Sequence, residues 1–457
     1  MPAIQEMSIS GLRGFADAQV VRPAVPVAGR AGSGITTIVG PNNSGKSTIL
    51  EAVAICARTQ PGATISRADR GRWTGYRTEI RVVYTDSRSL AYSNGPNDLD
   101  QFQLTQALST KEAAGYCPYF VSRDRTFPAA VNHTQFDRST LIRNAQAWAR
   151  GKSTDLSHRV RSWTNPKWKA LFRELSGVEL DFLIEGQRAI VIADGHEHQP
   201  VSMGAGLSEL ACILDALTDA PDGSIVMIDE PEASLHPVAQ RRLMSLFRVE
   251  SERLQIIIAT HSPLFVCWTS LANGGALVRV TREHARSCRV SQLSQQTAIA
   301  VAGLARDLNN PHVLGQDATE VLFQPDGIVL VEGQEDVVCF RSVMENMSSD
   351  AQFFGWGVGG ADKMALVAQL LKEVGFRRVA GILDSDRSSL RNELSEKFPR
   401  YEFYCLPTAN VRDKPAQPPR DKVEGLFDRS GTLKGEHQGT VNGLLAQLER
   451  YFRQSDA

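Results

Sequence analysis

The sequence predicts an α/β protein with two domains, and three patterns support this prediction. An apolar run at residues 35–39 leads into a glycine-bounded loop and then into a helix. A second apolar run, at residues 225–228, ends in two carboxylates. From residue 328 onward, strand and helix patterns alternate in the order βαβαβ, which implies a parallel sheet with right-handed crossovers. At 457 residues, the chain is long enough for two or three domains, each with its own hydrophobic core.

The composition is that of an ordinary globular protein. Apolar residues make up 42% of the chain, charged residues 22%, and the formal net charge is −1, which excludes a disordered chain and a polycation. No apolar run approaches the roughly 18 residues that a membrane span needs, and the N-terminus lacks a signal-peptide pattern. The seven cysteines show no metal-binding spacing, so we expect reduced thiols. These features predict a cytoplasmic protein with no membrane partner.

The chain is expected to divide after its first 300 or so residues. Pro325-Asp326-Gly327 is a strong structure breaker. We therefore expect a first domain at residues 1–310, a linker at residues 311–326 and a second domain at residues 327–457. Helix and strand signals weaken at about residues 95–180, which we interpret as a second lobe of the first domain with an inserted helical, dimerisation segment.

A complete phosphate-binding loop, G-x-x-x-x-G-K-S, occupies residues 40–47. A strand precedes it and a helix follows it, which is the context that this motif requires. Its glycines let backbone N–H groups point at phosphates, and the helix N-terminus adds a favourable dipole. Lys46 is expected to reach the β- and γ-phosphates of ATP, and the Ser47 hydroxyl to ligate Mg²⁺. The expected nucleotide contacts in this segment are Gly40, Asn42, Asn43, Ser44, Gly45, Lys46, Ser47 and Thr48.

Three polar residues follow two further apolar strands. Asp229 and Glu230 come directly after the run at residues 225–228. We expect Asp229 to support the Mg²⁺ and Glu230 to act as the general base toward the attacking water. His261 follows the apolar run at residues 256–259, a position from which it can sense the γ-phosphate. The alternative for a lone histidine is a purely structural role.

Positive charge is concentrated at residues 121–170, where ten Lys or Arg stand against three Asp, with three tryptophans among them. Such a stretch can neutralise nucleic-acid phosphates even though the charges of the whole chain balance. The alternative is a solvated or dimerising helical face whose tryptophans belong to a core. The arginines that we single out in this stretch are Arg138, Arg143, Arg150 and Arg159.

In the C-terminal part, carboxylates follow the first and third predicted strands. Glu332 follows the strand at residues 328–331, and Asp384 and Asp386 follow the strand at residues 379–383. Ligands collect at the carboxyl ends of parallel strands, so these side chains converge if the two strands are neighbours. Three hard oxygen donors without histidine suit Mg²⁺ or Mn²⁺. The remaining expected elements are helices at residues 334–346, 362–374 and 440–452 and a strand at residues 353–358.

The first domain resembles the ABC-type ATPases of the SMC, RecF and OLD (overcoming lysogenization defect) families. The segment D-E-P-E-A-S-L-H-P at residues 229–237 is similar to their Walker B motif and D-loop, and S-G-L-R-G-F at residues 10–15 is similar to their opening segment. The resemblance implies a nucleotide contact by Arg13. It also implies an ATP-sandwich homodimer or higher homo-oligomer, in which the signature loop binds the partner subunit's γ-phosphate. That loop corresponds to Ser202, Gly204 and Gly206, in a sequence that departs from the L-S-G-G-Q form.

The second domain resembles a Toprim domain, whose glutamate and D-x-D pair carry divalent metals. The resemblance assigns these roles to Glu332, Asp384 and Asp386, and it makes Glu424 a candidate further ligand for a second metal. An ABC-type ATPase followed by a Toprim domain is the arrangement of the OLD nucleases. It implies an ATP-regulated, metal-dependent nuclease acting in anti-phage defence.

Other functions are compatible with parts of the sequence. A non-nucleolytic ATPase scaffold or sensor would use the Toprim-like module to bind a partner or nucleic acid. A RecF-like repair clamp would explain the N-terminal motifs and leave the C-terminal carboxylates unexplained. The nucleic-acid substrate, DNA or tRNA, stays open, as does the participation of a separate effector protein.

Overall fold

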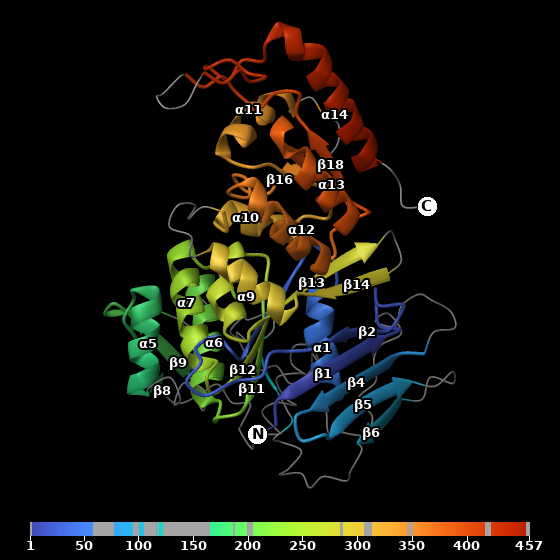
Figure 1. Ribbon diagram of the computed structural model, residues 1–457. Helices are drawn as coiled ribbons and strands as arrows, with labels where there is room; N and C mark the ends of the chain where they lie inside the picture. Colours follow the sequence, from blue (N-terminus) through green and yellow to red (C-terminus); the bar gives the residue numbers. More distant parts are fainter. Residues whose placement is uncertain are drawn as a thin grey trace. The chain divides into compact units, whose positions relative to one another are not determined.

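The computed structural model (Figure 1) separates into two compact units, Met1–Gln292 and Leu293–Ala457. Both units combine strands with helices, which confirms the predicted α/β class. The division lies before residues 311–326, the segment predicted as a linker, and that segment contains helix α10 (Gln316–Glu320) and the 3₁₀ turn η3 (Val321–Phe323). The residues that the structure describes are 2–57, 77–94, 100–104, 116, 118–121, 165–185, 188–198, 204–283, 287–305, 313–344, 347, 351–415 and 422–453.

A six-stranded sheet in the order β14-β13-β3-β12-β11-β7 forms the centre of the first unit. All neighbours in it are parallel except β13 and β14. Strands β3, β11 and β12 are buried along their whole length, as expected for parallel strands that are covered on both faces. The strands are β3 (Ile35–Val39), β7 (Tyr119–Val121), β11 (Ile225–Asp229), β12 (Gln255–Ala259), β13 (Ala276–Glu283) and β14 (Ser287–Gln292).

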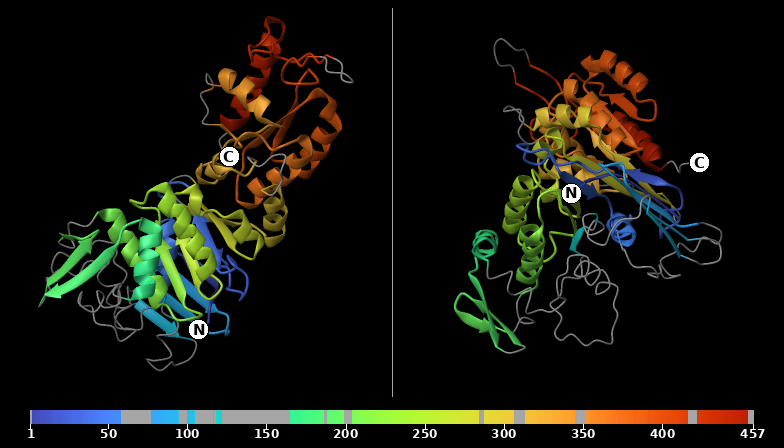
Figure 2. Two further views of the ribbon diagram at one scale, coloured as in Figure 1. Left: turned by 90° about the vertical axis from the view of Figure 1, so that its left-hand side faces the viewer. Right: turned by 90° about the horizontal axis from the view of Figure 1, so that it is seen from below.

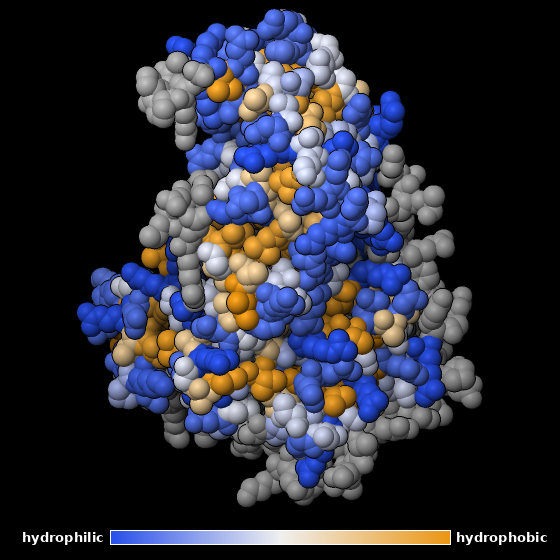
Figure 3. Space-filling model, viewed as in Figure 1, coloured by the Kyte–Doolittle hydropathy of each residue, from blue (hydrophilic) through white to orange (hydrophobic). Residues whose placement is uncertain are grey.

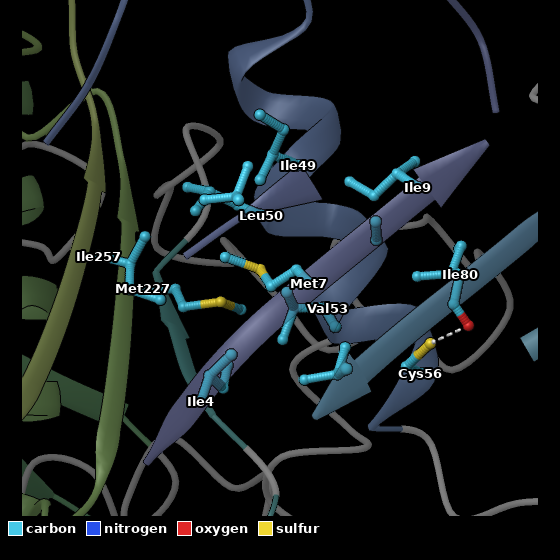
Figure 4. Packing of buried hydrophobic residues seen from close by; sticks show 14 of the residues in the cluster. Ile4, Met7, Ile9, Ile49, Leu50, Val53, Cys56, Ile80, Met227 and Ile257 are labelled. Carbon is cyan, nitrogen blue, oxygen red and sulfur yellow. Dashed lines mark hydrogen bonds between the residues drawn. The ribbon is translucent and has the colours of Figure 1, made fainter. Parts of the chain in front are cut away.

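Helix α1 (Lys46–Cys56) lies between this sheet and an antiparallel sheet in the order β2-β1-β4-β5-β6. Figure 4 shows the core between them, where Met7 of β1 and Leu50 of α1 lie near Met227 of β11. Each such side chain contributes about 1.5–3 kcal/mol when it is fully buried, so this core fixes the helix that follows the phosphate loop. The antiparallel strands are β1 (Ile4–Ser10), β2 (Gln19–Val21), β4 (Glu79–Tyr84), β5 (Ser89–Asn94) and β6 (Asp100–Leu104).

The opposite face of the six-stranded sheet is covered by α6 (Ala205–Asp219) and α7 (Pro237–Glu250), and α5 (Pro166–Ser176) packs on these two helices. Trp168 and Phe172 of α5 are fully buried and stack with their ring centroids 5.0 Å apart. Trp168 is thus a core residue, as the structural interpretation of the basic stretch predicts. Figure 2 shows α5 beside a small antiparallel sheet at one edge of this unit. That sheet contains β8 (Leu180–Glu185), β9 (Arg188–Ala193) and β10 (His196–His198), and the short η2 (Pro263–Phe265) and α8 (Trp268–Ala272) complete the described elements of this unit.

The second unit contains a parallel sheet in the order β16-β15-β17-β18. Its first and third strands in sequence, β15 and β17, are neighbours, which is the condition under which the predicted carboxylates converge. The chain runs outward from β15 in one direction to β16 and in the other to β17 and β18. The sheet therefore has a topological switch point between β15 and β17, where ligands bind in open α/β sheets. The strands are β15 (Ile328–Leu330), β16 (Gln352–Phe353), β17 (Val379–Leu383) and β18 (Glu402–Cys405).

The described part of the second unit contains five further α-helices: α9 (Gln295–Leu304), α11 (Gln334–Met344), α12 (Met364–Glu373), α13 (Ser388–Lys397) and α14 (Gln438–Arg453). Helix α14 covers the core through Val441, Leu448 and Tyr451. Hydrophilic residues predominate over the uppermost part of this unit in Figure 3, around α11 and α14. None of the described helices combines the length and the apolar character that a bilayer crossing needs.

Candidate functional site

The loop between β3 and α1 has the backbone conformation of a phosphate cradle. Gly40 has φ 141° and Gly45 has φ 107°, values that L side chains rarely adopt, and Asn43 has φ 59°. A Cβ on Gly40 would lie 2.0 Å from the carbonyl oxygen of Val280. Helix α1 begins at Lys46 and has no side-chain cap. Its first N–H groups, with the positive end of the helix dipole, are therefore available to an anion.

Lys46 is buried at the start of α1. Its Nζ donates hydrogen bonds of 2.9 Å to the carbonyl oxygens of Gly40 and Pro41. Burial lowers the pKa of Lys46 to about 8, although Asp229 and Glu230 oppose this shift. The ammonium thus lies inside the loop, beside acidic groups and at the place where phosphates would bind.

Ser47 and Asp229 come together from α1 and β11. The Ser47 hydroxyl donates a 3.0 Å hydrogen bond to Oδ1 of Asp229, which is buried at the carboxyl end of β11. One hydroxyl and one carboxylate at the edge of the phosphate loop fit the way P-loop proteins hold Mg²⁺. The donor set at this position is therefore suited to the ion.

Glu230 and His261 lie on either side of the same space. Glu230 has φ 49°, and its N–H donates a 2.8 Å hydrogen bond to the carbonyl of Ala259 at the end of β12. The imidazole of His261 places Nε2 3.7 Å from Oε1 of Glu230 and Nδ1 3.5 Å from Nζ of Lys46. His261 thus lies between Lys46, the predicted phosphate contact, and Glu230, the predicted general base.

Arg13 contacts the helix that follows the phosphate loop. Its Nη1 lies 3.2 Å from the Thr48 hydroxyl and 2.8 Å from Oε2 of Glu51, with which it forms an ion pair. Arg13 itself has φ 48°. The guanidinium therefore lies along the first turns of α1, and a direct contact between Arg13 and nucleotide stays a prediction.

The predicted signature loop is only partly described. Ser202 lies outside the described residues, and so do Arg138, Arg143, Arg150 and Arg159. Gly204 caps α6 without a side-chain hydrogen bond, as Gly45 does for α1, although the Leu207 N–H already donates to the Gly204 carbonyl at 3.0 Å. A Cβ on Gly206 would lie 2.4 Å from the carbonyl oxygen of Ser234. The start of α6 therefore packs closely on the loop that follows Glu230.

A cluster of carboxylates lies at the switch point of the second unit. The N–H of Asp384 donates a 3.2 Å hydrogen bond to Oε1 of Glu332, which joins the ends of β17 and β15. Asp336, in the first turn of α11, accepts a 2.8 Å hydrogen bond from the N–H of Gly333. We call Glu332, Asp336, Asp384 and Asp386 the acidic cluster.

Burial and like charge raise two pKa values in the acidic cluster. The pKa of Asp384 is raised to about 7 by burial and by the charges of Glu332, Asp336 and Asp386. Burial, with the nearby charge of Glu332, also raises the pKa of Asp336 to about 6. A divalent cation would relieve this repulsion, and hard oxygen donors suit Mg²⁺ or Mn²⁺. No three His, Cys, Asp or Glu side chains within the described ranges already have a metal-ligating arrangement.

Backbone groups support one side of the acidic cluster. The N–H groups of Gly359 and Gly360 donate to the carbonyl oxygen of Glu332 at 3.0 and 2.9 Å. Glu424, the predicted further ligand, is exposed and forms a 3.1 Å ion pair with Lys422. Within the described part of the chain, no hydrogen bond or ion pair joins Glu424 to the acidic cluster, so its metal role stays a prediction.

Comparison with known families assigns the first unit to a broad class. Residues 118–266 match a family model described as "AAA domain, putative AbiEii toxin, Type IV TA system". Residues 6–107 match a second model, described as "AAA domain". The two matches contain the phosphate loop, Asp229, Glu230 and His261.

Curated relatives agree with this class. The phosphonates import ATP-binding protein PhnC 2 of Cupriavidus necator is 29% identical over 98 residues, which are 21% of this chain and 34% of the relative. The phosphate import ATP-binding protein PstB 2 of a Synechococcus species is 32% identical over 90 residues, or 19% of this chain and 33% of the relative. The chain thus spans about a third of the length of these relatives. The first unit contains an ATPase domain of the AAA/ABC type.

Solved structures similar to the chain include two SMC head domains. The head with an extended coiled coil from Pyrococcus furiosus, bound to the C-terminal domain of ScpA, gives a TM-score of 0.47 at 13% identity, covering 67% of this chain and 100% of that one. The head domain from Thermotoga maritima gives 0.39 at 14% identity, covering 64% of this chain and 99% of that one.

Two residues that the sequence analysis did not assign belong to the geometry of these sites. In the ATPase domain, Glu232 accepts hydrogen bonds from the Thr260 hydroxyl, at 2.7 Å, and from the N–H of His261. In the second unit, Asp336 joins the acidic cluster. Its place beside Glu332 depends on where α11 begins, and the partners of Glu232 follow a strand that is distant in the sequence. Neither residue is therefore marked by a local sequence pattern.

Proposed function

We propose that the ATPase domain binds and hydrolyses ATP with Mg²⁺, and that this cycle regulates a divalent-metal-dependent nuclease of the OLD type in the second unit. The observation that carries the nuclease proposal is the acidic cluster at the switch point of a parallel sheet. Burial and the neighbouring carboxylates raise the pKa values of Asp336 and Asp384, so a cation bound there would relieve the cost of holding these groups ionised. Structural carboxylates are seldom kept together in this way without a compensating positive group.

In the ATPase domain, each residue has a distinct task. Lys46 and the loop N–H groups would hold the phosphates, and Ser47 with Asp229 would hold Mg²⁺. Glu230 would accept a proton from the attacking water, and His261 would contact the γ-phosphate from the other side. The 3.5 and 3.7 Å distances from the imidazole to Lys46 and Glu230 support this division of roles.

In the second unit, the acidic cluster would hold the divalent ions. A bound metal would supply charge stabilisation for phosphodiester cleavage. Glu332 and Asp384 would act as ligands whose backbones are fixed by the bonds from Gly359, Gly360 and the Asp384 N–H. Asp336 would add a donor from the first turn of α11, which the four residues assigned from sequence did not include.

The partners of this activity are nucleic acid and a second copy of the chain. The uncapped start of α6 at Gly204, packed on the loop after Glu230, supports an ATP-sandwich homodimer in which that helix start faces the partner's nucleotide. A role in anti-phage defence, with or without a separate effector protein, follows from the OLD resemblance alone.

A second function, a non-nucleolytic ATPase sensor, has one observation in its favour. Within the described ranges, no three acidic, histidine or cysteine side chains are already arranged for a metal. In the sensor, the second unit would bind nucleic acid or protein without cutting. Metal binding would then have no catalytic consequence.

One experiment separates the two functions. Purified protein is incubated with plasmid, single-stranded DNA and tRNA, in Mg²⁺ or Mn²⁺, with and without ATP, while phosphate release is recorded in parallel. The nuclease proposal predicts cleavage of at least one substrate that requires the divalent ion and changes with ATP. ATP hydrolysis without cleavage of any of the three would favour the sensor, and no hydrolysis with or without nucleic acid would contradict both.

A further inference from the structure

The loop that follows Glu230, residues 230–236, is tied to the His261 segment through one side chain. Glu232 is partly buried in the ATPase domain, and its two carboxylate oxygens have different partners. Oε2 accepts a 2.7 Å hydrogen bond from the Thr260 hydroxyl, and Oε1 accepts one from the backbone N–H of His261. The carboxylate therefore holds the two residues that directly follow β12.

We propose that Glu232 is a positioning residue for ATP hydrolysis, which fixes His261 between Lys46 and Glu230. This inference rests on the proposed ATPase function and adds to it a residue that acts through His261 rather than on the nucleotide. Glu232 makes its bonds to the backbone of His261 and to the neighbouring hydroxyl, and the imidazole faces Lys46 and Glu230.

The contacts of the imidazole with Lys46 and Glu230 are long. Its ring nitrogens lie 3.5 Å from Lys46 Nζ and 3.7 Å from Glu230 Oε1, distances at which hydrogen bonds are weak. The position of the His261 backbone, which Glu232 holds, therefore helps to set where the ring lies between these two groups. The 3.1 Å bond from the Thr260 N–H to the Ile38 carbonyl of β3 also anchors this segment.

A second connection joins the same two segments. Oγ of Ser262 donates a 2.7 Å bond to Oε1 of Gln240, and Nε2 of Gln240 donates a 2.8 Å bond to the carbonyl of Leu235. The N–H of Ser262 donates to the Thr260 hydroxyl oxygen at 2.9 Å. The loop at residues 230–236 thus holds both ends of the Thr260–Ser262 segment, one end through Glu232 and the other through Gln240.

The same loop is also held by the start of α6. The Ser234 hydroxyl lies 3.4 Å from Oε1 of Glu209, and Gly206 packs directly on the Ser234 carbonyl. A shift of α6 would therefore reach His261 through Ser234 and Glu232. The positioning role of Glu232 therefore connects the start of α6, which follows the predicted signature loop, to His261 within one chain.

A carboxylate is the group that this position requires. Thr260 and His261 present two donors, and the Thr260 oxygen already accepts from the Ser262 N–H. A glutamine at position 232 offers one acceptor and one NH₂ donor. Its oxygen can still accept from the His261 N–H, but its NH₂ must donate to the Thr260 oxygen, so the Thr260 hydroxyl has to turn its proton elsewhere. Both remaining bonds also lose the charge of the carboxylate, so the hold on Thr260 and His261 is weakened while the size is kept.

The test is steady-state ATP hydrolysis and ATP binding by Glu232→Gln in the full chain, with Glu197→Gln, exposed on β10, as the matched control. We expect kcat to fall by about 10- to 100-fold, because a small misplacement of a reacting group costs this much. The ATP Kd should stay within about threefold, since Lys46 and the loop are untouched. The control should match wild type in both measurements.

A double-mutant cycle with His261→Ala gives a readout that a merely structural role would not produce. If Glu232 acts through His261, Glu232→Gln should lower kcat by less than about twofold in the His261→Ala background. Three results would overturn the inference. The first is a double mutant whose loss of kcat equals the product of the two single losses, and the second is a wild-type kcat in Glu232→Gln. The third is a Glu232→Gln variant that loses kcat, ATP affinity and melting temperature together. The proposed ATPase function fails separately, if the wild-type protein itself hydrolyses no ATP.

Discussion

Burial lowers the pKa of Lys46 to about 8, a range that a simple titration can reach. Bound phosphates favour the ammonium form, so the pKa of Lys46 is higher in the ATP complex than in the free protein. At a pH between the pKa of Lys46 in the free protein and its pKa in the ATP complex, Lys46 takes up a proton when ATP binds. The ATP affinity must therefore fall as the pH rises above about 8, by up to about tenfold per pH unit.

Calorimetric titration of ATP between pH 7 and pH 9.5 measures this dependence. In Lys46→Arg the guanidinium keeps its charge over the whole range. That variant should show a flat profile, whatever its absolute affinity. An equally flat profile in the wild type would mean that Lys46 is not the group on the phosphates.

Glu230 is the residue on which hydrolysis should depend most directly. Glu230→Gln keeps the shape of the side chain and removes the base, so we expect ATP binding to persist while kcat falls by about 10²- to 10⁴-fold. The stalled protein should accumulate as an ATP-bound closed dimer. Sedimentation velocity with and without ATP tests this association, and normal turnover with no change in sedimentation would contradict both the base and the dimer.

The sequence allows a role to be assigned to a residue when the residue belongs to a motif whose geometry is known. Lys46, Ser47 and Asp229 belong to short patterns with one known geometry, and the structure brings Ser47 and Asp229 to 3.0 Å. Glu232 and Asp336 have roles that depend on a distant strand or on where a helix begins. Such contacts are set by packing, and a single sequence does not contain them in any local pattern.

At the scale of elements, the apolar strands were predictable and the short ones were not. The runs that became β3, β11, β12 and β17 are buried along their length. The strand predicted at residues 353–358 is only Gln352–Phe353, because Gly355 and Gly357, with φ 51° and 95°, turn the chain out of the sheet. β18 and α13 were not expected, and in α13 only Leu394 is buried, so this helix lacks the apolar face that marks a helix in the sequence.

Helix α9, which was not predicted either, begins at the cap residue Ser294, which is held by a side chain from another helix. Glu373 of α12 accepts a 2.9 Å hydrogen bond from the Ser294 N–H and one of 2.6 Å from the Thr297 hydroxyl. Glu373→Ala removes both acceptors, so we expect a loss of about 1–2 kcal/mol in the free energy of unfolding. Urea unfolding measures the loss, and hydrogen exchange should locate it in the first turn of α9.

Glu393→Ala, an exposed substitution on α13, is the matched control for Glu373→Ala and should change stability by less than about 0.5 kcal/mol. Unchanged exchange in α9 after Glu373→Ala would show that Ser294, which accepts from the Thr297 N–H at 3.2 Å, caps the helix without help.

At the scale of the whole molecule, the sequence pattern and the contacts divide the chain at different points. The Pro325-Asp326-Gly327 breaker directly precedes β15, but the contacts divide the chain at Gln292 and Leu293. Structure-breaking residues show where a helix or strand ends. The boundary between two units depends instead on the hydrophobic core into which each helix packs. Helix α9 packs with α12, so it belongs to the second unit although it precedes the breaker.

The two proposed activities occupy different units, so they should be separable by mutation. Asp384→Ala and Asp386→Ala each remove a hard oxygen donor from the acidic cluster and leave the phosphate loop, Asp229 and Glu230 unchanged. ATP hydrolysis should stay within about threefold of wild type, while divalent-dependent cleavage should fall by about 10²-fold or more, because metal stabilisation of the reacting oxygens is worth several kcal/mol. Glu396→Gln, exposed on α13, is the control. If both aspartate variants cut as fast as wild type, the cleavage does not come from the acidic cluster. If they lose ATP hydrolysis to the same extent as cleavage, the two activities do not belong to separate units.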